Sequence, residues 1–130
     1  MKGLFKKIVV AVFLLYFAYI LMPYAWHLMY DQETLNALSW NGHGGKINLY
    51  GPIPYIISGI TLISLVGLHQ LKEWGRKLFL ITVIASGLIT PMFGLGVQGG
   101  FDSFAAYFLT IGTGAILSIS YFSSIAGSFE

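Results

Sequence analysis

Four long apolar runs, separated by short polar segments, dominate the pattern along the chain. They predict membrane-spanning helices over residues 8–28, 53–71, 78–97 and 104–123. Each run is close to the roughly 20 residues that a helix needs to cross a bilayer. The first follows a basic start, Met1–Lys7, but it is longer than the 7–15 residues or so of a signal peptide, and no small-residue cleavage pattern follows. We therefore expect an uncleaved first helix, kinked at Pro23.

The polar segments predict the connections between these helices. Residues 30–52 form one sizeable loop, in which Asp31 is expected to cap a short helix that ends near Ser39. Glycine and asparagine in 41–46 indicate a flexible turn. Residues 72–77 form the charged connection between the second and third spans, and Asp102 or Ser103 is expected to be the N-cap of the fourth.

The distribution of basic residues predicts the orientation in the membrane. With four spans, both termini and the 72–77 connection lie on one side, together with Lys2, Lys6, Lys7, Lys72, Arg76 and Lys77. Lys46 alone lies opposite. Because cytoplasmic loops carry an excess of Lys and Arg, we expect both termini in the cytoplasm and the 30–52 loop outside, in a bacterial inner membrane.

Composition supports a membrane protein and narrows its chemistry. Apolar residues make up 56% of the chain and charged residues 9%, against about 25% charged in soluble domains. The fold class that we expect is an all-α four-transmembrane-helix bundle forming a single domain, 1–130. The net charge of +2 gives no indication of a nucleic-acid partner, the chain contains no cysteine for thiol chemistry, and no cofactor is predicted.

Small and hydroxyl-bearing residues recur at intervals of three or four in the last three spans. This spacing places them on one face of each helix, where they let helices approach closely in lipid. The predicted packing residues are Ser58, Thr61, Ser64 and Gly67, then Thr82, Ser86 and Thr90, and then Ala106, Thr110, Gly114 and Ser118. A hydroxyl-lined permeation path is the alternative interpretation.

The first span has a different pattern, with Ala11, Ala18 and Ala25 at heptad spacing and bulky aromatic residues between them. It either packs on its own bundle and turns its aromatic residues to lipid, or contacts another protein. The residues predicted to contact a partner are Ala11, Tyr16, Ala18, Tyr19, Trp40, His43 and Tyr50.

Candidate catalytic chemistry is sparse. The four apolar runs contain no Asp, Glu, Lys or Arg, which argues against a pump or antiporter and leads us to expect no enzyme activity. His27 and Asp31 stand four residues apart, and share a face if the first helix continues that far. They are the candidate metal ligands, with a polar helix end meeting water as the alternative. The GxGxxG pattern at 94–99 follows a membrane helix and not a strand, so it indicates a turn.

In size and layout the chain resembles small bacterial inner-membrane proteins, including immunity proteins against pore-forming toxins. This resemblance is one of arrangement and assigns no role to individual residues. The leading hypothesis is a non-enzymatic membrane protein that binds another membrane protein, as an accessory, assembly or immunity subunit, or that forms a homo-oligomer. The alternative is a small oligomeric channel or permease.

Overall fold

The computed structural model describes residues 1–48 and 51–130, and this part of the chain contains helices and turns but no β-strand. The elements are α1 (Lys2–Met29), α2 (Gln32–Leu38), α3 (Pro52–His69), α4 (Glu73–Ile89), the 3-10 helix η1 (Thr90–Phe93), α5 (Gly100–Phe122) and the 3-10 helix η2 (Ala126–Ser128). Among the described residues, four segments are long and apolar enough to cross a membrane: α1, α3, α4 with η1, and α5. The all-α prediction with four such helices is therefore confirmed.

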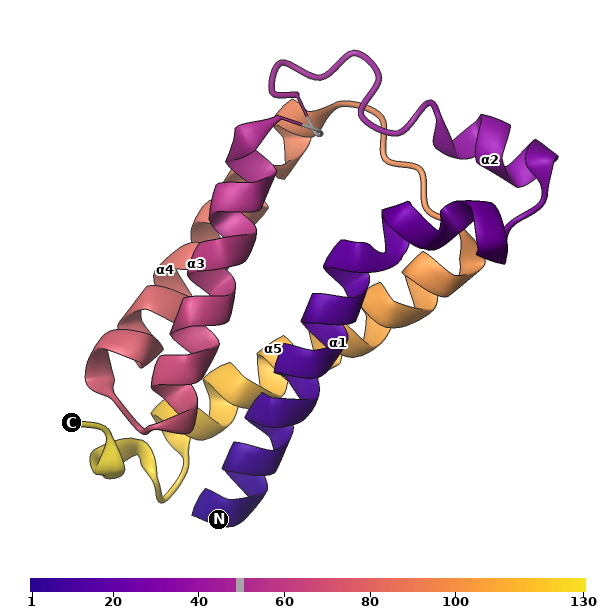
Figure 1. Ribbon diagram of the computed structural model, residues 1–130. Coiled ribbons are helices and arrows are strands. Elements are labelled where there is room, and N and C mark those ends of the chain that lie inside the picture. Colours follow the sequence, from indigo (N-terminus) through magenta and orange to yellow (C-terminus); the bar gives the residue numbers. More distant parts are fainter. Residues whose placement is uncertain (49–50) are drawn as a thin grey trace.

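The long helices form two pairs, α3 with α4 and α1 with α5, and α1 also packs against α3 (Figure 1). The pairs converge at one end, where both termini and the α3–α4 turn lie, and spread apart at the other, near α2 (Figure 1). We call these the narrow end and the wide end. Pro23 lies inside α1, whose last turns bend toward α2 (Figure 1).

Helices α1, α4 and α5 each begin at least four residues before the apolar run from which they were predicted, and α3 begins one residue before its run. Helix α4 begins at Glu73, so that the predicted 72–77 connection shrinks to residues 70–72. An acidic residue in the first turn favours this start, and the Glu73 carboxylate pairs with Arg76 one turn later. Helix α5 begins at Gly100 with Gly99 as its N-cap, not Asp102 or Ser103. Charged residues absent from the apolar runs therefore lie in the end turns of the helices.

Helices α3 and α4 approach closely through two glycines. A Cβ on Gly75 would lie 2.6 Å from the Gly67 carbonyl carbon, and one on Gly67 would lie 2.8 Å from the Gly75 Cα. Thr61 and Ser64 on α3 and Thr82 on α4 are also buried, and their hydroxyls donate to carbonyls of their own helices. Of the other residues predicted to pack, Ser58 and Ser86 are half-buried and Thr90 is exposed.

Helix α5 packs on α1 with a face that differs from the predicted one. Ala105, Leu109 and Ile116 are buried, and Gly112 lies where any side chain would overlap Val12 of α1. Ala106 is half-buried, whereas the rest of the predicted face is exposed. These exposed residues are Thr110, Gly114 and Ser118. The α1–α5 contact therefore leaves a row of small residues uncovered on α5.

The chain end closes the narrow end. The Phe129 ring meets the edge of Phe5, with centroids 5.8 Å apart, and the backbone of Glu130 bonds to Leu71 and Glu73. Arg76 joins this tail to α4 and α5. Its guanidinium contacts the Ser120 carbonyl at 3.0 Å, the Ala126 carbonyl at 3.1 Å, the Glu73 carboxylate, and the rings of Tyr121 and Phe129.

Candidate functional site

The wide end is built by docking of the loop after α2, residues 39–48, onto the segment between α4 and α5. The Gly42 N–H donates to the Leu95 carbonyl at 2.6 Å, and the Leu95 N–H donates to the His43 carbonyl at 2.9 Å. Gly94 has a φ of +84° and lies where a side chain would overlap the His43 backbone, so this crossing requires glycine. Residues 94–99, which carry the GxGxxG pattern, are thus a non-helical connection with an isolated bridge from Gly94 to Gly44, and not the predicted turn.

Tyr30 connects the end of α1 to the start of α5. Its hydroxyl accepts hydrogen bonds from the Phe101 N–H at 3.0 Å and the Asp102 N–H at 3.2 Å, and donates to the Asp102 carboxylate at 3.0 Å. Gly99 lies against the Tyr30 ring, where a Cβ would overlap it. Burial is the main cause that raises the pKa of Tyr30, and the Asp102 carboxylate raises it further. No sequence pattern signals this capping role, because the two partners lie more than seventy residues apart.

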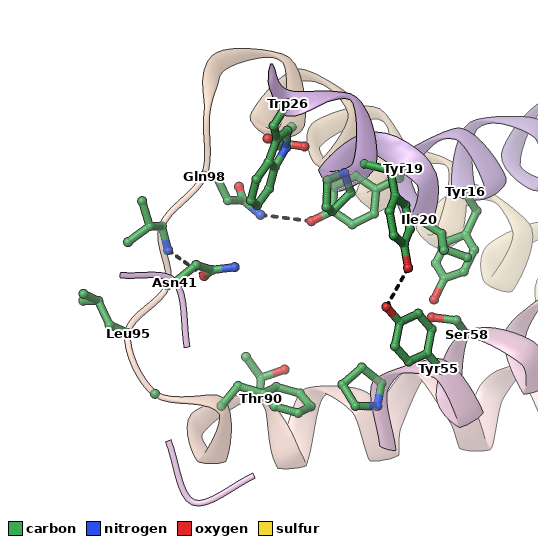
Figure 2. Close-up of a pocket in the computed structure, with 18 residues that line it drawn as sticks. Tyr16, Tyr19, Ile20, Trp26, Asn41, Tyr55, Ser58, Thr90, Leu95 and Gln98 are labelled. Carbon is green, nitrogen blue, oxygen red and sulfur yellow. Dashed lines mark hydrogen bonds between the residues drawn. The ribbon is translucent and has the colours of Figure 1, made fainter. Parts of the chain in front are cut away.

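Between the two helix pairs, the wide end has a cavity of about 790 Å³ that is open to the outside, since two of its lining residues, Tyr24 and Tyr55, are exposed. Figure 2 shows side chains of α1, α3 and residues 90–98 around one open space. We call it the wide-end cavity. Its lining residues are Tyr16, Tyr19, Ile20, Pro23, Tyr24, Trp26, Asn41, Pro54, Tyr55, Ser58, Thr90, Phe93, Gly94, Leu95, Gly96, Val97, Gln98 and Asp102.

Hydrogen bonds across the wide-end cavity hold its walls together. The Tyr24 and Tyr55 hydroxyls are 2.9 Å apart and link α1 to α3, and the Gln98 side-chain N–H donates to the Tyr19 hydroxyl at 3.2 Å (Figure 2). The Asn41 side-chain oxygen accepts from the Val97 N–H at 3.0 Å. Both helix pairs and the 39–48 loop therefore contribute polar groups to a wall that is partly aromatic.

The residues predicted to contact a partner separate into three groups. Tyr16 and Tyr19 face the wide-end cavity, whereas Ala11 and Ala18 are exposed on α1. Trp40 is 54% exposed, and its ring meets that of His43 with centroids 4.8 Å apart. Tyr50 lies outside the described residues. The partner-contacting role of all these residues stays a prediction.

A metal site at His27 and Asp31 would require both residues to lie on one face of α1, and the structure does not place them so. Helix α1 ends at Met29, and Tyr30 has an extended backbone, so that His27 and Asp31 do not share one helical face. Asp31 instead caps α2, as predicted, and its carboxylate accepts the Thr34 N–H at 2.8 Å. This hydrogen bond lowers the pKa of Asp31. The described residues contain no group of three or more His, Asp or Glu side chains placed to hold a metal ion.

Comparison with protein families, curated proteins and solved structures finds no match to the chain. The residues and their arrangement are therefore the basis on which a function can be assigned.

Proposed function

We propose that this is a non-enzymatic membrane protein that acts by binding a transmembrane helix of another membrane protein. One observation carries the proposal: α5 leaves Thr110, Gly114 and Ser118 exposed at intervals of four, while a different face of the same helix packs on α1. In lipid, covering an apolar face gains little, whereas small residues let a second helix approach closely. An uncovered row of small residues is therefore a suitable docking face for another helix.

Helix α1 extends the same argument. Its buried residues, Phe5, Val9 and Val12, all lie in its first half, and the exposed Ala11 and Ala18 are one heptad apart. Heptad spacing of small residues suits packing against one neighbouring helix. The Trp40–His43 pair adds an exposed aromatic contact beyond the end of the helices. These features favour a partner that has both a membrane helix and a segment outside the membrane, which fits an accessory, assembly or immunity subunit.

The arrangement of charge supports an orientation with the narrow end in the cytoplasm of a bacterial inner membrane. Both termini and the α3–α4 turn gather at that end (Figure 1). The basic residues on these segments are Lys2, Lys6, Lys7, Lys72, Arg76 and Lys77. Lys46 belongs to the outer loop at the wide end. The positive-inside rule then favours an outer loop and a wide-end cavity on the outer side.

The alternative is a channel lined by hydroxyl groups. It requires the hydroxyl-bearing faces of α4 and α5 to line one common path. Thr82 is buried on α4, whereas Thr110 and Ser118 are exposed on α5, away from the α1 contact. The Thr82 and Thr110 hydroxyls also donate to carbonyls in their own helices. One chain therefore does not align the two rows, and a channel built from them would need several copies.

Substitution of an exposed glycine tests the docking face. We expect Gly114→Leu to abolish co-purification of the partner in mild detergent, because the larger side chain blocks close helix approach. Gly87→Leu on α4 is the matched control, since both glycines are exposed and a Cβ added at either would meet no atom within 4 Å. Recovery of monomer alone from native membranes, or equal capture by both variants, would contradict the proposal. Capture of a second copy alone would identify a homo-oligomer instead.

A further inference from the structure

The wide-end cavity has the size and wall chemistry of a small-molecule site. Its volume of about 790 Å³ lies within the range of roughly 300–1,000 Å³ that ligand pockets occupy. Aromatic side chains from two different helices form much of the wall: Tyr16, Tyr19, Tyr24, Trp26 and Tyr55. The walls belong to the wide end and not to the α5 docking face, so ligand binding in this cavity is independent of the proposed function.

The formal charge that the described residues place on the wall of the wide-end cavity is negative only. Among the described residues that line the cavity, Asp102 carries the one formal charge, and no Lys, Arg or His is present. Asp102 is 4% exposed and accepts a hydrogen bond from Tyr30, and no cationic side chain of the described residues forms an ion pair with it. A buried carboxylate without a cation nearby disfavours an anionic ligand and favours a positively charged one.

Aromatic rings favour the same sign of charge. The face of an aromatic ring attracts a cation, most strongly when water is excluded, and several rings around one site recognise quaternary ammonium groups. Figure 2 shows Tyr16, Tyr19, Trp26 and Tyr55 on the walls of one open space. The Trp26 indole N–H is buried and has no hydrogen-bond partner among the described residues.

Apolar side chains complete the site. Ile20, Pro23, Pro54 and Phe93 line the cavity beside the aromatic rings, at the ends of helices that are long and apolar enough to cross a membrane. A hydrocarbon chain attached to the cationic group would lie against these residues and continue into the lipid. We propose that the wide-end cavity binds a cationic amphiphile, with its ammonium head held by the aromatic rings and Asp102.

Three probes that share a dodecyl hydrocarbon chain and differ in their head groups test this proposal. They are added to the whole protein in dodecyl maltoside micelles. They are dodecyltrimethylammonium, dodecanoate and dodecanol, titrated against Trp26 fluorescence with Trp40 and Trp74 changed to Phe. We expect a saturable response to dodecyltrimethylammonium alone. Asp102→Asn and Tyr55→Leu should each weaken it by about tenfold, whereas Glu33→Gln, an exposed carboxylate on α2, should leave it unchanged.

The absence of a saturable response to dodecyltrimethylammonium would overturn the proposal. A saturable response to dodecanoate or dodecanol equal to that of the cation would overturn the proposal, because the site would then lack charge selectivity. Titrations of Asp102→Asn and Tyr55→Leu that match the parent would overturn it as well. Asp102 also contacts Tyr30 at the start of α5, so if Asp102→Asn does not fold, Tyr55→Leu decides, since Tyr55 is exposed and lies in the first turn of α3.

Discussion

Gly75→Ala is expected to destabilise the folded protein by about 3 kcal/mol, near the upper end of the cost of overpacking. The new Cβ would lie 2.6 Å from the Gly67 carbonyl carbon and 2.7 Å from the Leu68 nitrogen. Both are backbone atoms, so no side-chain rotation relieves the overlap, and α3 and α4 have to move apart.

Reversible unfolding in mixed micelles measures this effect. Gly87→Ala is the matched control on the same helix, because a Cβ there meets no atom within 4 Å. Its effect should stay within about 1 kcal/mol and favour the helix, as alanine is the better helix former. Equal stability of the two variants would show that the α3–α4 contact does not pass through Gly75.

Arg76→Ala is expected to have the second large effect, a decrease of about 3 kcal/mol in the free energy of unfolding. The substitution removes charge-assisted hydrogen bonds, an ion pair and stacking on two rings. The Arg76 side chain is 14% exposed and donates to the Ser120 and Ala126 carbonyls. Truncation leaves both carbonyls without this donor and releases the Phe129 ring. Arg76→Lys should recover less than half of the loss, because an ammonium group cannot reproduce the planar fork of the guanidinium.

The neighbouring Lys77 provides the control for Arg76. Its side chain is 68% exposed and lies 3.8 Å from the same Glu73 carboxylate. Lys77→Ala should therefore cost no more than about 0.5 kcal/mol, as exposed ion pairs usually do. Proteolysis of the chain end gives an independent measurement, and only Arg76→Ala should expose residues 126–130 to cleavage. A protected tail in that variant would contradict the role of Arg76.

Most of the fold could be predicted because long apolar runs and caps are local signals. The four runs match α1, α3, α4 with η1, and α5, and the Asp31 cap of α2 was found from its residue type. The helix ends were less predictable. Charged residues at 72–77 suggested a connection, but Glu73 and Arg76 pair within one helical turn and extend α4 into it.

The packing face of α5 could not be predicted from the sequence. Small residues recur on two faces of this helix, one that includes Gly112 and one that includes Gly114. In lipid either face can meet a neighbour, because covering apolar surface does not distinguish them. The close fit of Gly112 against Val12 selects the face of α5 that packs on α1, and Val12 lies about a hundred positions away in the sequence. The wide-end cavity and the Tyr30 cap depend on similarly distant contacts.

The absence of cysteine from the chain allows a direct test of the central claim, that α5 meets α1 through Gly112 and leaves the Gly114 face uncovered. A Cβ at Gly112 would lie 3.8 Å from the Val12 Cβ, which is the usual separation in a disulfide. Oxidation in native membranes should therefore cross-link Val12→Cys with Gly112→Cys within one chain. Cross-linking of Val12→Cys with Gly114→Cys instead, or of neither pair, would contradict this packing of α5 on α1.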